Sequence, residues 1–267
     1  MNALLVTERA LRDRGRGLTG WALGIAAYVA LMTSFYPSVH GSEFQRAIAN
    51  YPKELKAFFG GAQSFDFSTG AGYLNVELFS LVVPALLVIV AIGYGASTLA
   101  GEQEAGTLDL LLSCPLTRRR VVCEKAVGLV STIFVLSLVT AIAILLTGAF
   151  VGLGVSADRV LIACMGTALI ATLCGLVGML AGALTMSRAA AIGAATVLFA
   201  ASYLVVGLAG LVSWLRPLRV ISPLYHATGT QPLRHGLPMA NYLILLGLCA
   251  LAFVATMIVF EHRNLRR

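Results

Sequence analysis

The stretch LFSLVVPALLVIVAIGYGASTL, residues 78–99, carries no charged side chain and is long enough to cross a membrane as an α-helix. A helix rises about 1.5 Å per residue, so roughly 20 apolar residues span a hydrocarbon core of about 30 Å. Five other runs share this character, and the predicted spans are 18–36, 78–99, 126–150, 160–184, 189–213 and 242–260. The sequence therefore predicts an all-α integral membrane protein, one transmembrane domain of six helices over residues 1–267.

The composition supports a membrane protein and excludes an ordinary soluble domain. Hydrophobic residues make up 58% of the chain and charged residues 12%, whereas a soluble domain has about 25% charged residues. Apolar and polar residues do not alternate with a period of two, which excludes the wall of a β-barrel. The first span could be the apolar core of a cleaved signal peptide. No small-x-small cleavage site follows it, so we interpret it as a retained helix.

Basic residues predict the orientation. Twelve of the 19 Lys and Arg residues lie on the side that holds both termini and the loop between spans two and three. That side is therefore expected to be cytoplasmic. Leu4, Leu11 and Leu18 recur every seven residues among arginines, which predicts an N-terminal helix at the membrane surface. The net charge of +7 needs no nucleic-acid partner, because basic flanks are attracted to anionic lipid.

The spans contain almost no ionisable residues. Glu77 and Arg188 lie at their edges, and no other Asp, Glu, Lys, Arg or His falls within them. A proton-coupled carrier needs ionisable groups at membrane depth, so this class is disfavoured. The chain also lacks a phosphate-binding Gly-x-x-x-x-Gly-Lys-Ser/Thr loop, a catalytic motif and a metal-ligand cluster. We expect no catalytic, cofactor or metal site, and any energy for transport must come from a partner.

Two segments on the opposite side are too long for simple turns. In residues 37–77, apolar residues keep helical spacing on both sides of Pro52, which predicts short amphipathic helices on the outer leaflet. In residues 214–240, Ser222 and Pro223 form a typical helix start, with Ser as the cap and Pro at the first position. This second segment is either a short helix that dips into the membrane or a surface loop.

Other local signals concern helix geometry. Residues 185–188 form a turn short enough to pair spans four and five as an antiparallel hairpin. Pro84 predicts a kink near the outer end of span two. Small residues four apart allow close helix contacts, and these pairs are Gly20 and Gly24, Gly148 and Gly152, Gly178 and Gly182, and Ala191 and Ala195.

The loop GEQEAGTLDLLLSCPLTRRRVVCEK, residues 101–125, is a charged island between apolar spans. Gly106 breaks the extension of span two, and Thr107 can cap a short new helix that ends at Pro115. Thr117 can open the next helix, which becomes span three after Arg118, Arg119 and Arg120. On the short helix Leu108, Leu111 and Leu112 share one face. An apolar face beside Glu102 and Glu104 could dock into a pocket of a cytoplasmic protein. The alternative interpretation is an ordinary inner loop whose arginines only fix the topology.

Residues 100–125 resemble the signature of membrane subunits of ATP-binding-cassette (ABC) transporters of the type-2 export-permease family. The six-span layout and the Ser222-Pro223-Leu224-Tyr225 segment resemble the family as well. Cys123 and Glu124 depart from it, because relatives more often have small or apolar residues there. The matching positions are Glu102, Glu104, Gly106, Thr107, Leu108, Leu110, Leu111, Leu112, Pro115, Arg118 and Lys125.

The resemblance implies a function and a set of partners. The island would be the coupling helix that docks on separate ATPase subunits, two per transporter, which bind ATP and Mg²⁺. A second copy of this chain or a paralogous permease would complete the pathway in a bacterial plasma membrane, with lipid or a multidrug-type amphiphile as cargo. The coupling residues implied are Glu102, Glu104, Gly106, Thr107, Leu108, Leu111, Leu112, Pro115 and Arg118.

Two other classes of function remain open on the sequence. A membrane anchor or scaffold would hold an ATPase or an outer partner without transporting anything. A self-sufficient channel or ion-coupled carrier would conduct without ATP. A neighbouring reading frame for an ATPase with a Walker motif would favour transport over both.

Overall fold

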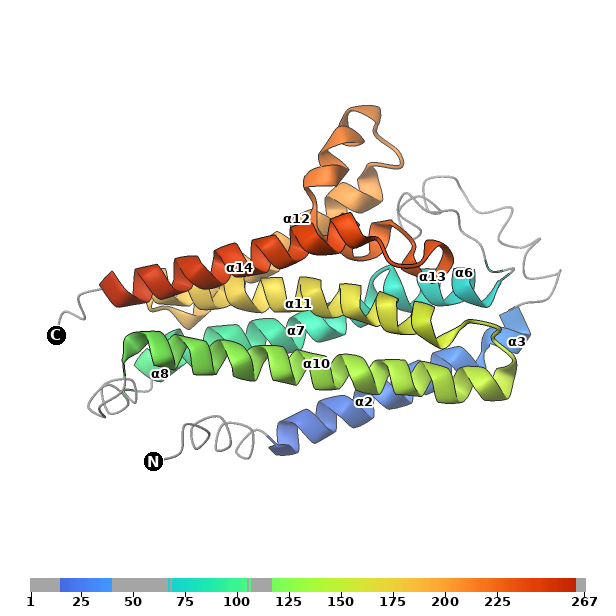
Figure 1. The fold of residues 1–267 in the computed structure, drawn as a ribbon, viewed down its shortest axis with the longest axis horizontal. Helices are drawn as coiled ribbons and strands as arrows, with labels where there is room; N and C mark the ends of the chain where they lie inside the picture. The colour runs from blue at the N-terminus through green and yellow to red at the C-terminus, as the bar shows by residue number, and fades with distance from the viewer. Residues whose placement is uncertain (1–14, 40–66, 68, 105, 107–116, 263–267) are drawn as a thin grey trace.

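The computed structural model describes residues 15–39, 67, 69–104, 106 and 117–262, and this part of the chain is helical, without strands (Figure 1). Six of its helical segments are long and apolar enough to cross a membrane. The predicted number and order of spans are therefore confirmed. The segments are Gly17–Val39, Gly70–Thr98, Arg118–Val151, Ala157–Thr185, Arg188–Leu208 and Met239–His262.

The spans are built from six long helices and several short ones. The long helices are α2 (Gly15–Ser34), α7 (Val82–Thr98), α10 (Arg118–Val151), α11 (Ala157–Thr185), α12 (Arg188–Leu208) and α14 (Met239–His262). The short α-helices are α3 (Tyr36–Val39), α6 (Gly70–Leu74), α8 (Ala100–Glu104) and α13 (Pro232–His235). Two π-helices, η1 (Asn75–Phe79) and η4 (Tyr225–Gly229), and two 3₁₀-helices, η2 (Ser213–Leu215) and η3 (Pro217–Ile221), complete the set.

Helix α14 ends at the end of the bundle where α8 lies, and α2 runs from this side toward the opposite end (Figure 1). We call the end where α8 lies the α8 end. The short helices α3, α6 and α13 lie at the opposite end (Figure 1). An even number of spans brings the chain back to the side on which it started, and the arrangement agrees with the predicted topology.

Helix α11 lies at the centre of the bundle. It packs against α7, α10, α12 and α14, and it is the most buried of the six candidate spans. After the last residue of α11, Met186 adopts the left-handed conformation, with φ of 56°. The Ser187 hydroxyl then accepts a hydrogen bond from Ala190 N and caps the start of α12. The predicted hairpin between spans four and five is confirmed.

Small residues allow the central helices to approach closely. A Cβ added to Gly95 of α7 would lie 2.2 Å from the carbonyl oxygen of Gly175 on α11. Farther along α11, a Cβ added to Gly178 would lie 3.7 Å from the Ala191 carbonyl oxygen and from the Ala195 Cβ of α12. Two of the small-residue pairs predicted from the sequence thus meet each other, and van der Waals packing between backbones holds these helices together.

Buried hydroxyl groups connect neighbouring helices by hydrogen bonds to backbone carbonyl groups. Ser137 of α10 donates to the carbonyl of Cys164 on α11 at 2.9 Å. Tyr242 of α14 donates to the carbonyl of Ile162 at 2.8 Å. In a medium without water such groups need partners inside the protein, and these bonds satisfy them.

The second span starts earlier than predicted and is irregular. Helix α6 and the π-helix η1 precede α7, and the chain bends at Leu81, whose φ is −144° and ψ −51°. Pro84 is the third residue of α7. Proline has no N–H to donate to the Ser80 carbonyl. The kink predicted at Pro84 stays a prediction, and the departure from helical dihedrals lies three residues earlier, at Leu81.

The segment between α12 and α14 first projects sideways from the bundle and then returns to it (Figure 1). A short helix begins at Pro223, as predicted, but the Ser222 hydroxyl does not cap it and donates instead to the Ser202 carbonyl at 3.0 Å. In η4, His226 is 4% exposed. Its Nδ1 lies 2.8 Å from Asn241 Oδ1 and its Nε2 2.7 Å from the Val220 carbonyl oxygen.

Some predicted elements lie outside the described residues. These are the N-terminal surface helix before residue 15, the amphipathic helices around Pro52 and the coupling helix within 107–116. They stay predictions.

Candidate functional site

The described part of the charged island lies at the α8 end. Helix α8 continues from α7 and ends at Glu104, and Gly106 follows with φ of +68° and donates its N–H to the Gln103 carbonyl at 3.0 Å. Glycine adopts this left-handed conformation without strain, so the predicted helix break at Gly106 is confirmed. Of the predicted coupling residues, Glu102, Glu104, Gly106 and Arg118 are described. The others, Thr107, Leu108, Leu111, Leu112 and Pro115, lie outside the described residues.

Glu102 connects α8 to α10. Its Oε1 accepts a hydrogen bond from Lys125 Nζ, and the side chains are 24% and 11% exposed. A partly buried pair of this kind is costly to break on one side only, since the remaining charge is left without its partner. The pair therefore fixes the position of α8 on the first turns of α10.

Glu104 connects α8 to α12. Its Oε1 accepts a hydrogen bond at 2.8 Å from the backbone N–H of Arg188, the first residue of α12. The first N–H groups of a helix have no partners within the helix, and a carboxylate there is also favoured by the helix dipole. A side chain of α8 thus completes the N-terminus of another transmembrane helix.

Arg118 and Arg119 connect α10 to the end of α14. Arg118 Nη1 lies 3.3 Å from the Phe260 carbonyl oxygen and 3.4 Å from that of Glu261. Arg119 Nε donates to Glu261 Oε2 at 2.9 Å. Cationic groups satisfy the free carbonyls at a helix C-terminus, so the first turn of α10 caps α14.

The first turn of α10 forms as predicted from Thr117, whose hydroxyl accepts a bond from Arg120 N at 3.4 Å. Arg120 Nε then pairs with Glu124 at 3.0 Å within the same helix. The apolar part of the third span was predicted from residue 126, and the helix that contains it begins eight residues earlier, at Arg118, directly after the predicted start at Thr117. With 34 residues at about 1.5 Å each, α10 is longer than a hydrocarbon core of about 30 Å requires, so its charged first turns do not need to lie in lipid.

An apolar cluster lies beneath these polar contacts. Leu99, Val122, Ala183 and Phe260 come from the ends of spans two, three, four and six and are fully or almost fully buried. The polar contacts and the apolar cluster join the same helix ends. We call the contacts of Glu102, Glu104, Arg118 and Arg119, together with this cluster, the α8 network.

The sequence predicted one residue of each contact but missed most of the partner residues. Arg188 was noted only as a charge at the edge of a span, and Glu261 was not singled out. Each lies more than 80 residues from its partner in the chain. An acidic residue just beyond the last span was the one available signal for Glu261.

The described residues contain no group of three or more His, Cys, Asp or Glu side chains placed to hold a metal ion. The chemistry of the α8 network is that of helix capping and ion pairing.

Comparisons with known proteins add the family. No curated protein matches the chain. The family described as ABC-2 family transporter protein matches residues 4–265. The match includes all six candidate spans and both flanks of the charged island. A match over nearly the whole chain places this protein in the ABC-2 family, as a membrane subunit of a transporter.

Proposed function

We propose that this chain is the permease subunit of an ATP-driven exporter. Two six-helix subunits, either two copies of this chain or one copy and a paralogue, enclose one pathway, and two separate ATPase subunits drive it. ATP and Mg²⁺ bind to the ATPase subunits. The family supports this assignment, and so does the lack of a phosphate-binding loop in the sequence.

In this proposal the α8 end faces the cytoplasm of a bacterial cell. The bias of Lys and Arg toward the predicted inner side supports this orientation. The island between α8 and α10 is then on the side where ATP is available.

The α8 network is the observation that carries the coupling role. A force on the segment between α8 and α10 would act on both helices through Glu102 and Lys125. It would reach α12 through Glu104 and α14 through Arg118 and Arg119. Four of the six spans respond directly to one contact point, which is what a switch between inward-facing and outward-facing states requires.

The test replaces residues of the island and measures the ATPase. The tagged chain is purified from its native membrane with the ATPase that accompanies it, and ATP hydrolysis is measured in lipid nanodiscs. The double change Glu104→Gln and Leu111→Ala is expected to lower hydrolysis to the rate of the ATPase alone while the chain stays inserted. Glu124→Gln is the matched control, because Glu124 pairs within α10 and joins no second helix.

Unchanged stimulation in the double variant would contradict the coupling role. An ATPase that binds the chain and hydrolyses ATP without moving any cargo would favour the anchor. Flux through liposomes that contain only this chain, without ATP, would favour a channel or an ion-coupled carrier.

A further inference from the structure

The segment that follows α12 exposes large apolar side chains, although it lies outside the six candidate spans. It includes η2 and η3, and we call residues 211–221 the lateral segment. On a spanning helix such side chains face lipid, but the lateral segment belongs to no span. A continuous exposed apolar patch marks an interaction surface. The apolar residues are Leu211, Trp214, Leu218, Val220 and Ile221, with Trp214 69% and Ile221 74% exposed.

The flanking helices place the lateral segment at the edge of the hydrocarbon core. Helix α12 has 21 residues and α14 has 24, so they extend about 32 and 36 Å from the α8 end. A hydrocarbon core is about 30 Å thick. The chain leaves α12 after one such length and turns sideways, short of the end at which α3, α6 and α13 lie (Figure 1). The lateral segment therefore lies beside the bundle, at the level where acyl chains meet headgroups.

The lateral segment is also basic. Arg216 is exposed, and the Arg219 guanidinium lies 5.0 Å from the centre of the Tyr225 ring. Between Asp158 and Glu261 the sequence has no acidic residue. Tryptophan is enriched at the membrane–water interface, and the planar guanidinium of arginine binds phosphate oxygens in pairs. The side chains of the segment thus match the chemistry of phospholipid headgroups at the depth where the helices place it.

We propose that the lateral segment binds anionic phospholipid in the leaflet opposite the α8 end. Trp214, Val220 and Ile221 lie against the upper acyl chains, and Arg216 and Arg219 lie against phosphate groups. A loop in water would leave the apolar side chains uncovered, and a helix that dips to the membrane centre would bury two arginines there at high cost. Bound lipid holds the adjoining ends of α12 and α14 at a fixed depth. This binding needs neither ATP nor an ATPase subunit, so it is independent of the proposed function.

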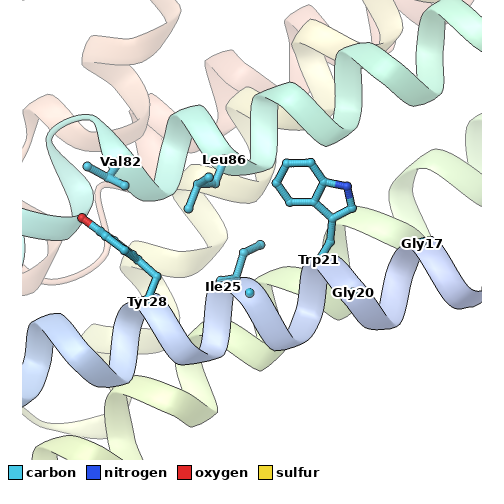
Figure 2. A pocket seen from close by; sticks show the side chains of 8 residues that line it. Gly17, Gly20, Trp21, Ile25, Tyr28, Val82 and Leu86 are labelled. Carbon is cyan, nitrogen blue, oxygen red and sulfur yellow. The ribbon is translucent and has the colours of Figure 1, made fainter.

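The test uses Trp214 as a depth reporter. The chain has two tryptophans, and the other one, Trp21, projects from α2 into an apolar groove of about 570 Å³ against α7 (Figure 2). The change Trp21→Phe leaves Trp214 as the single fluorescent reporter. The full chain is placed in nanodiscs whose phosphatidylcholine carries a nitroxide quencher on the headgroup, at the top of the acyl chain or at its end. Iodide is the quencher in water.

We expect the label at the top of the acyl chain to quench Trp214 most strongly. Iodide and the label at the end of the acyl chain should have little effect, because the lateral segment lies between the water and the membrane centre. Nanodiscs with unlabelled lipid give the reference fluorescence.

A second measurement tests the preference for anionic lipid. Labelled phosphatidylglycerol is compared with phosphatidylcholine labelled at the same depth, and the quenching gives the ratio of their association constants. The double change Arg216→Gln and Arg219→Gln should lower this ratio at least about fivefold, which is the contribution of one basic residue beside anionic lipid. Arg159→Gln is the matched control, because it removes an exposed arginine at the start of α11, outside the lateral segment.

Four results would overturn the proposal. Strongest quenching from the end of the acyl chain would show that the segment dips into the membrane, and strong quenching by iodide would show that it lies in water. Quenching from no position would show that protein covers Trp214, either another part of this chain or a second copy. A lipid ratio that the double variant leaves unchanged would show that Arg216 and Arg219 do not bind the headgroups.

Discussion

Gly95→Ala tests the close crossing of α7 and α11. The added Cβ would lie 2.2 Å from the Gly175 carbonyl oxygen, and because real Cβ atoms stay at least 3.0 Å from other atoms, α7 and α11 must separate there by 0.8 Å or more. Forcing an extra methyl group into a packed interior costs about 1–3 kcal/mol. A cost of about 2 kcal/mol lowers the Tm of a chain of this size by roughly 4–8 °C.

The assay is thermal unfolding of the purified protein in detergent, followed by the loss of its monodisperse peak in size-exclusion chromatography. Gly93→Ala is the matched control, since it lies on the same helix and its Cβ would meet nothing within 4 Å. Its Tm should stay unchanged or rise, because alanine is favoured over glycine in a helix by up to about 1 kcal/mol. Equal Tm values for the two variants would refute the close crossing of α7 and α11.

Three further changes probe polar contacts in the same assay. Glu102→Gln and Lys125→Met should be non-additive by about 1 kcal/mol or more in a double-mutant cycle, and strict additivity would show that the two side chains do not interact. Glu261→Gln should change Tm by no more than about 2 °C, because its ion pair with Arg119 is exposed and such pairs contribute little; a large drop would show that the pair is more important. His226→Phe removes the polar contacts of both ring nitrogens at a buried site and should cost about 1–3 kcal/mol, and a wild-type Tm would argue against these contacts.

Hydrophobic runs were sufficient to predict the six spans, because a membrane helix satisfies its own backbone and leaves a continuous apolar signal. They misplaced the start of span two and the end of span five, which was predicted at residue 213 and lies at Leu208. Glu77 was taken as the edge of span two, although the span continues back through η1 and α6 to Gly70. The apolar run of span three began only at residue 126, but Thr117, which the sequence predicted as the start of this helix, does cap it, and the arginines lie in its first turn.

The contacts of the charged island were beyond prediction from sequence. The pattern singled out Glu104 as acidic and Arg118 as basic, but it gave no partner for either. Their partners are backbone groups at helix ends, the N–H of Arg188 and the carbonyl of Phe260. Every residue has such groups, so only the packing of α12 and α14 determines which of them meet the island.

The central place of α11 has a consequence for biosynthesis. During translation α11 enters the membrane after α7 and α10 but before α12 and α14, and all four are its packing partners. The face of α11 that packs on α12 and α14, including Gly178 and Gly182, therefore has no partner helix until the chain is nearly complete. The nascent protein tolerates this because that surface is apolar, and a chain stopped before Met239 would lack the helix that encloses α11.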